Sequence, residues 1–309
     1  LHVDLSTHEI KSKTIPQKLR DEYTGGWGLA AKYLYDTIDP GIDPLSKENA
    51  IVIMTGPVCG TLVPTSARTC LVSKSPKTGT IFESNIGGSF GPELKFAGYD
   101  GIMITGKSKK PVYLRIENNI VSLEDAGPVM GKGIFDTEVW LKDQVDAEAK
   151  TLSIGPAGEN LIEFSCVGSE SYRQMGRGGA GALFGSKNLK AIACKGTGGV
   201  QVNEIGAFYE KVMEHTANNL LTDANMWAKS NGTPVLMDVT NEMGIHPTRN
   251  FTKGVSNGRL KLNTDAIDDV KIGDRSCASC PMGCGKFTSL NGTQIEGPEY
   301  ETLCLGGSN

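Results

Sequence analysis

The sequence lacks the long apolar run of a membrane-spanning helix, because no stretch approaches the ~20 apolar residues that crossing a bilayer requires. It also lacks a block of basic residues, and the formal net charge of the 309-residue chain is only −4. This charge excludes nucleic acid as the main partner. The N-terminal residues show no export signal, so we expect a cytoplasmic protein whose cysteines stay reduced.

The sequence does have an ordinary globular composition, with 39% hydrophobic and 21% charged residues. Short apolar runs of β type, such as residues 51–54 and 189–193, alternate with turns as far as about residue 200. Helical and polar segments follow. We therefore expect a β-rich domain over residues 1–200 and the start of a helical domain over residues 201–309. The first residue is not Met and the last ones follow an apolar stretch, so we expect a piece of a longer protein.

Three cysteines near the end of the chain carry the strongest chemical information. Cys277, Cys280 and Cys284 lie within eight residues, on a segment broken by proline and glycine. Thiolates grouped in this way are typical ligands of a [4Fe–4S] cluster, which would make the protein an electron carrier. Structural zinc is the alternative, although zinc ligands usually form two separated pairs, and the fourth ligand would be Cys304 or a residue beyond residue 309. A disulfide between such close neighbours has poor geometry.

Glycines are numerous, 39 in all, and several of them are clustered. Residues 176–181 match the spacing G-x-G-x-x-G, but a polar segment precedes them where a dinucleotide site needs a strand. Glycine lets backbone N–H groups approach a ligand closely. Because Arg173 precedes this run and Arg177 lies within it, we expect a site for a phosphate or a phosphorylated cofactor.

Other polar residues are either ordinary surface residues or candidates for a site. By composition alone Arg68 is an ordinary surface ion-pair residue. Asn85, beside Gly87 and Gly88, is able to offer an oxygen atom to a cation. Residues 296–301 hold three carboxylates close behind the cysteines. They form either a solvated turn or an acid/base group that faces a redox site.

Together these segments resemble the aldehyde ferredoxin oxidoreductase family of tungsten–pterin enzymes. The matching stretches are residues 28–35, 43–49, 55–57, 74–79, 87–101, 155–160, 176–179, 185–192 and 296–301, together with the three cysteines. They run in order over nearly the whole chain. The resemblance implies an α+β fold, in which a β-rich N-terminal domain of two packed sheets forms a base for a bis-pterin cofactor and a mainly helical domain begins after it.

The resemblance also implies roles for single residues. Arg68 and Arg173 would lie near the pterin phosphates, and Asn85 and Gln174 would give backbone carbonyls to a Mg²⁺ that bridges them. Glu301 matches a catalytic carboxylate near the tungsten or molybdenum. The expected cofactor-binding set is Arg68, Asn85, Gly87, Gly88, Arg173, Gln174, Gly176 and Arg177. The expected ligands of the [4Fe–4S] cluster are Cys277, Cys280 and Cys284.

The chain also departs from the family pattern. Trp27 stands where many relatives have Arg, and Gln174 stands where members usually have Ala. The fourth cluster cysteine of the family lies in a later domain, so Cys304 is not expected to be that ligand. Two pterin motifs and a catalytic histidine would fall beyond residue 309. The resemblance therefore covers the N-terminal half of the enzyme.

Three functions are compatible with these observations. The first is an oxidoreductase that oxidises a small aldehyde with water to a carboxylic acid, in an anaerobic cytoplasm. Its tungsten or molybdenum bis-pterin would pass electrons through the [4Fe–4S] cluster to ferredoxin or an electron-transfer subunit, in a homodimer or larger complex. The second is a subunit of a ring-reducing aromatic acyl-CoA reductase with the same cofactor. The third is a zinc-stapled binding protein without redox activity.

Overall fold

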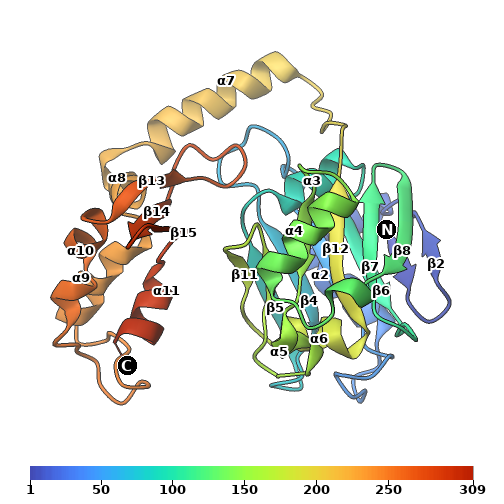
Figure 1. The fold of residues 1–309 in the computed structure, drawn as a ribbon. Helices are drawn as coiled ribbons and strands as arrows, with labels where there is room; N and C mark the ends of the chain where they lie inside the picture. The colour runs from blue at the N-terminus through green and yellow to red at the C-terminus, as the bar shows by residue number, and fades with distance from the viewer. Residues whose placement is uncertain (309) are drawn as a thin grey trace. The chain divides into compact units, whose positions relative to one another are not determined.

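The computed structural model describes residues 1–308 of the protein, which form two compact units, Leu1–Gln201 and Val202–Asn309 (Figure 1). The first unit contains two six-stranded sheets, and the second contains short helices and a three-stranded sheet. The predicted α+β fold, two packed sheets followed by a mainly helical segment, is therefore confirmed. The role of the first unit as a cofactor base stays a prediction.

The first sheet has the strand order β2-β1-β6-β3-β4-β5. Its strands are β1 (His2–Asp4), β2 (Glu9–Lys11), β3 (Ile51–Thr55), β4 (Thr69–Lys74), β5 (Ile81–Ile86) and β6 (Gly101–Thr105). All its pairs are antiparallel except β1 with β6. Helices α1 (Gln17–Tyr23), α2 (Gly26–Thr37) and α3 (Phe90–Phe96) belong to the same part of the chain. Strand β5 forms one edge of this sheet, which matters for the site described below.

The second sheet has the strand order β11-β10-β9-β12-β7-β8, so β11 is its edge strand. Its strands are β7 (Val112–Glu117), β8 (Ile120–Asp125), β9 (Lys150–Ser153), β10 (Val167–Ser169), β11 (Arg173–Met175) and β12 (Leu189–Lys195). Its helices are the 3₁₀ turn η1 (Gly127–Val129), α4 (Ile134–Gln144), α5 (Pro156–Glu159) and α6 (Ala180–Ser186). Only β7 and β12 pair in parallel.

One hydrophobic core joins the two sheets. It contains Ile51, Ile53, Leu71, Ile102 and Ile104 of the first sheet, Leu114, Ile116, Leu152 and Ile192 of the second, and Phe90, Leu94, Leu183 and Phe184 of α3 and α6. The alternate residues of β3 and β4 face the other way and pack against α2. Those of β7 and β12 pack against α4. Most central strand residues are therefore buried on both faces, which explains why their sequences read as continuous apolar runs.

The second unit has a much smaller core, formed by Met237, Ile267 and Leu303. Its helical segments are α7 (Ile205–His215), η2 (Thr216–Leu220), η3 (Asp223–Asn225), α8 (Met226–Ser230), η4 (Thr233–Val235), α9 (Leu236–Glu242), η5 (Arg259–Lys261), α10 (Thr264–Asp268), α11 (Tyr300–Thr302) and η6 (Leu303–Gly307). Strands β13 (Lys271–Arg275), β14 (Gly285–Leu290) and β15 (Thr293–Glu296) form its antiparallel sheet in that order.

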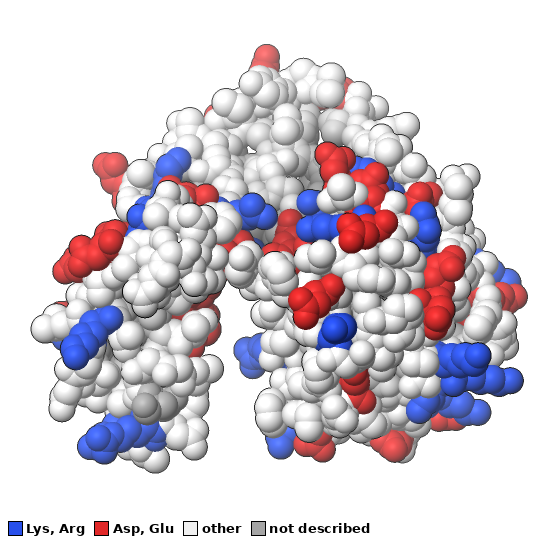
Figure 2. Space-filling model, viewed as in Figure 1, with Lys and Arg blue, Asp and Glu red and all other residues white. Residues whose placement is uncertain are grey.

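The surface agrees with the balanced charge of the sequence. On the face seen in Figure 2, basic and acidic side chains are intermixed and no single basic field dominates. Within residues 1–308, no helix combines the length and the apolar character that crossing a membrane demands.

A buried lysine links the two sheets of the first unit through hydrogen bonds. Lys187 lies just before β12, and its Nζ donates hydrogen bonds to the carbonyl of Asn49 at 2.6 Å and to that of Gly106 at 3.0 Å. Asn49 precedes β3 and Gly106 follows β6, so both acceptors belong to the first sheet. Burial lowers the pKa of Lys187 from 10.5 to about 8. The ammonium group therefore links the sheets at a cost in desolvation.

This cost predicts a pH dependence of stability. Between pH 8 and 10.5 the folded state holds fewer protons at Lys187 than the unfolded state, so folding becomes more favourable as the pH rises through this window. Relative to Lys187→Met, the native protein should gain up to about 1.4 kcal/mol of unfolding free energy per pH unit there. Urea unfolding at several pH values measures this difference. The exposed Lys109→Met variant is the control and should follow the native protein; parallel curves for Lys187→Met would contradict the prediction.

Candidate functional site

The edge strands of the two sheets lie against each other in the first unit. β5 and β11 are in contact, and the backbone N–H of Arg177 donates a hydrogen bond to the Ser84 hydroxyl at 3.2 Å. Nearly all of the expected cofactor-binding residues lie on these two strands or directly after them. We call the following set the edge site: Arg68, Asn85, Gly87, Gly88, Arg173, Gln174, Gly176 and Arg177.

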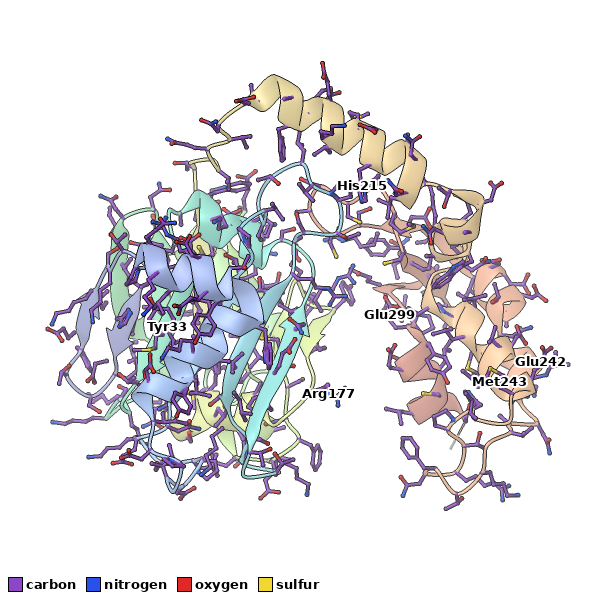
Figure 3. All side chains as sticks on the ribbon, turned by 180° about the vertical axis from the view of Figure 1, so that it is seen from behind. Tyr33, Arg177, His215, Glu242, Met243 and Glu299 are labelled. Carbon is purple, nitrogen blue, oxygen red and sulfur yellow. The ribbon has the colours of Figure 1, made fainter. Side chains whose placement is uncertain are left out.

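Arg68 joins this set through strand register. It precedes β4, whose Thr69 pairs with Ile86 at the end of β5. Arg68 therefore lies at the end of the strand pair from which Gly87 and Gly88 continue. Its side chain is exposed, as is that of Arg177, which extends outward from the first unit (Figure 3). Two exposed guanidinium groups beside backbone glycines suit an anionic ligand.

The side chains of Asn85 and Gln174 already have neighbours of their own. The Asn85 amide donates to the carboxylate of Glu83 on the same face of β5. The Oε1 atom of Gln174 accepts a hydrogen bond from the Cys166 thiol at 2.9 Å. Each contact engages one polar atom of an amide side chain that is otherwise exposed.

Glu170, which the sequence reasoning did not identify, connects the two halves of the edge site. Its carboxylate accepts a hydrogen bond from the backbone N–H of Ser89 at 2.8 Å, directly after the glycine pair. A Cβ at Gly88 would lie 1.8 Å from Glu170 Oε2, and the φ angle of Gly88 is +86°. Only glycine fits at this position for both reasons. The carboxylate thus fixes the turn after β5 to the turn between β10 and β11.

The turn between β10 and β11 has an unusual backbone that is well supported. Glu170 and Ser171 both have positive φ angles, 49° and 63°. Such conformations cost energy in residues other than glycine and persist only when neighbouring groups hold them. Glu138 of α4, which is buried, provides this support by accepting a hydrogen bond from the Ser171 N–H at 2.6 Å. The arrangement places Arg173 and Gln174 at the start of β11.

The glycine run at residues 176–181 serves two purposes. A strand, β11, does precede the run and α6 follows it, whereas the sequence had indicated only a polar segment there. Nevertheless β11 is a three-residue edge strand that pairs antiparallel with β10, which is not the parallel unit of a dinucleotide site. A Cβ at Gly178 would meet the Phe82 ring at 1.9 Å, so that glycine is required by packing. Gly176 is exposed with open space around it and can face a ligand.

In the second unit, the three cysteines lie on one turn between β13 and β14. We call residues 277–284 the cysteine turn. The backbone N–H of Cys280 donates to the Cys277 carbonyl at 3.1 Å, and positive φ angles occur at Ser279 and Gly283. Within residues 1–308, no three His, Cys, Asp or Glu side chains are grouped closely enough to hold a metal ion. The convergence of the cysteines on one metal centre therefore stays a prediction.

Glu301 lies exposed on α11 and lines an open depression together with Thr302, Leu305 and Gly306. The residue before it, Tyr300, is held firmly. Its backbone N–H donates to Thr233 at 3.0 Å, and its hydroxyl lies 3.0 Å from the Thr240 hydroxyl.

Two further contacts hold the segment that leads to Glu301. The hydroxyl of Thr233 donates to Glu299, which is labelled in Figure 3, at 2.5 Å. His246 packs edge-on against the Tyr300 ring, and its Nε2 lies 2.8 Å from the Ser308 hydroxyl. Burial lowers the pKa of His246, so the ring is neutral near pH 7. The sequence pattern gave no signal for this buried histidine, since it occurs in a polar segment that reads as a loop.

Comparisons with known proteins agree along the whole chain. The family model described as "Aldehyde ferredoxin oxidoreductase, N-terminal domain" matches residues 1–196, and the one described as "Aldehyde ferredoxin oxidoreductase, domains 2 & 3" matches residues 208–309. The tungsten-containing aldehyde ferredoxin oxidoreductase of Pyrococcus furiosus is 41% identical over 314 residues, which cover 100% of this chain and 52% of that protein.

More distant relatives have other activities. The aliphatic sulfonate oxidoreductase, WOR-like subunit, of Pyrococcus furiosus is 30% identical over 100% of this chain and 53% of its own length. A solved structure, the active site complex BamBC of benzoyl coenzyme A reductase with 1,5-dienoyl-CoA, matches with a TM-score of 0.82 and 30% identity. The match covers 98% of this chain and 48% of that chain. The chain thus spans about half the length of these relatives.

The tight fit at Gly88 yields a prediction about stability. Gly88 and Gly79 both have positive φ angles, +86° and +69°, so alanine at either position carries about 1 kcal/mol of backbone strain. Only Gly88→Ala also displaces Glu170 from the Ser89 N–H, because a Cβ at Gly79 meets nothing within 4 Å. We expect Gly88→Ala to lower the unfolding free energy by a further ~1–3 kcal/mol. Urea unfolding of both variants measures this, and equal losses would contradict the assigned role of Glu170.

Proposed function

Because this chain belongs to the aldehyde ferredoxin oxidoreductase family, we propose that it forms the cofactor-binding part of a tungsten–pterin oxidoreductase. The edge site is the observation that carries this proposal. It joins exposed arginines, backbone glycines and two turns on the edges of two rigid sheets. Such a site suits a large ligand with phosphate groups, which a pterin cofactor provides.

The residues of the edge site would bind different groups of the cofactor. Arg68 and Arg173 would neutralise the pterin phosphates, and Arg177 adds a third positive charge at the same edge. Asn85 and Gln174 would give backbone carbonyls to a bridging Mg²⁺, which prefers oxygen ligands. This division agrees with the side chains of both residues being engaged elsewhere.

The reaction that we propose is the oxidation of a small aldehyde with water to a carboxylic acid, which releases two electrons and two protons. A tungsten or molybdenum pterin held at the edge site would supply a two-electron acceptor, and a [4Fe–4S] cluster would supply single-electron transfer to ferredoxin. Cys277, Cys280 and Cys284 would supply thiolate ligands to this cluster. The protein would be cytoplasmic and form a homodimer or a larger complex with an electron-transfer subunit.

Glu301 would act as the general base of this reaction. Its carboxylate is exposed in an open depression, where a water molecule or a substrate can reach it. As general base, Glu301 would take a proton from the attacking water and later release it to solvent. Glu299 and Tyr300, the two residues before Glu301, are both hydrogen-bonded to Thr233, which keeps the segment in place.

A second candidate keeps the cofactor site and changes the substrate. The structural neighbour in a benzoyl coenzyme A reductase complex, with a TM-score of 0.82, favours a subunit that reduces an aromatic acyl-CoA ring. The edge site is compatible with both reactions because it would contact the cofactor rather than the substrate. Assays of the full-length protein with aldehydes and a ferredoxin or viologen acceptor, and with aromatic acyl-CoA esters and a strong reductant, distinguish the two.

Metal analysis of the full-length, anaerobically purified protein tests the proposal. We expect tungsten or molybdenum together with roughly four irons per chain, the content of one [4Fe–4S] cluster. Cys280→Ser should lower the iron content while tungsten or molybdenum remains, because only a cluster ligand is lost. Cys304→Ser is the matched control and should keep the iron. A protein that contains zinc alone would contradict both redox functions and favour a zinc-stapled binding protein.

Glu301→Gln tests the catalytic role of the carboxylate. The variant keeps the size and polarity of the side chain but is no longer a base, so kcat for aldehyde oxidation should fall by ~10²–10⁴. Its tungsten, molybdenum and iron contents should equal those of the native protein. Glu242→Gln changes another exposed carboxylate of the second unit and should leave kcat unchanged. Native activity in Glu301→Gln would remove Glu301 from the mechanism.

A further inference from the structure

Lys286 of β14 is buried directly beside the cysteine turn. Its side chain is 1% exposed and it lies two residues after Cys284. A buried ammonium group is stable only when its hydrogens have acceptors. The Nζ atom of Lys286 donates to the carbonyl of Lys229 at 2.6 Å, to Asp274 Oδ1 at 2.9 Å and to the carbonyl of Gly283 at 3.0 Å. All three hydrogens are therefore used.

The three acceptors come from three different segments of the second unit. Gly283 belongs to the cysteine turn and has a φ angle of +59°. Asp274 lies on β13, three residues before Cys277, and Lys229 lies on α8. Lys286 thus joins the strand that enters the turn, the end of the turn itself and a helix that packs beside it. One ammonium group therefore ties the strand before the cysteine turn and the end of that turn to α8.

Gly232 provides a second constraint at the same point. A Cβ at this position would lie 2.3 Å from the Cys284 carbonyl oxygen and 3.3 Å from Cε of Lys286, and its φ angle is +68°. The backbone at Gly232 therefore packs directly against Cys284. This contact is made by backbone atoms and supports the same conformation of the cysteine turn.

We propose that Lys286 is a positioning residue that sets the shape of the cysteine turn before any metal binds. Ordering a backbone costs about 1–2 kcal/mol per residue. When contacts within the second unit order the turn, the conformational entropy is lost during folding. Binding of a cluster then does not have to order the turn. The consequence for a [4Fe–4S] cluster rests on the proposed function, but the preset shape of the metal-free turn does not.

Hydrogen–deuterium exchange of the full-length protein, purified without iron, tests the preset turn. Lys286→Met keeps the aliphatic stem but loses all three hydrogen bonds, so amides of residues 277–288 should exchange at least about tenfold faster than in the native protein. Lys271→Met is the matched control, because Lys271 also contacts Asp274, at 3.0 Å, and donates to the carbonyl of Ser230, which lies outside the cysteine turn. It should exchange like the native protein in that region.

Gly232→Ala provides an independent variant in case Lys286→Met fails to fold. It should raise exchange in the same peptide, whereas Gly244→Ala, with a similar φ of +72° and nothing within 4 Å, should not. Exchange in α9 of the second unit, whose Met237 belongs to the core of that unit, reports whether each variant is folded. Unchanged exchange in folded Lys286→Met, or an unprotected turn in the native iron-free protein, would overturn the proposal.

Reconstitution with iron and sulfide separates this proposal from the proposed function. Lys286→Met should lose its cluster to a chelator about tenfold faster than the native protein and Lys271→Met, as judged by absorbance near ~400 nm. Equal rates of loss would count against a role of Lys286 toward the cluster. Native protein that takes up no iron, but shows the predicted exchange differences, would contradict the cluster and support the preset turn.

Discussion

The hydrogen bond between the Glu170 carboxylate and the Ser89 N–H is the interaction on which the edge site depends. The two sheets of the first unit share a core, but a core of this kind fixes strands better than the turns at their ends. Glu170 ties together the two turns that carry Gly88 and Arg173. The phosphate-bearing ligand that we propose would contact both turns, and this hydrogen bond would set their spacing before the ligand binds.

Buried lysines also connect separate segments elsewhere in the chain. Lys187 joins the two sheets, Lys190 donates to the carbonyl of Ile154 at 2.6 Å and to Glu159 at 2.5 Å, and Lys286 holds the cysteine turn. Each ammonium group satisfies backbone carbonyls that irregular segments leave unpaired. Irregular segments have few backbone partners of their own, so a buried donor with three hydrogens stabilises them.

Sequence reasoning found the parts of the fold that depend on local pattern. The apolar runs predicted strands because β3 and β12 are buried on both faces, and the matched segments located the edge-site residues. It missed contacts that depend on tertiary structure. Glu170 reads as one polar residue among many, and the strand β11 is too short and polar to show a β pattern. Lys286 and His246 look like surface residues in the sequence, whereas both are buried.

The position of the edge site also bears on aggregation. An unpaired strand edge presents backbone donors and acceptors that can recruit another chain. On the other side of each sheet, β2 and β8 carry charged residues such as Lys11 and Glu124, which discourage such pairing. The first sheet ends at β5 and the second at β11, and these two edges lie against each other. The edge site thus lies where each of these sheet edges covers part of the other, which limits the access of another chain to their unpaired backbone groups.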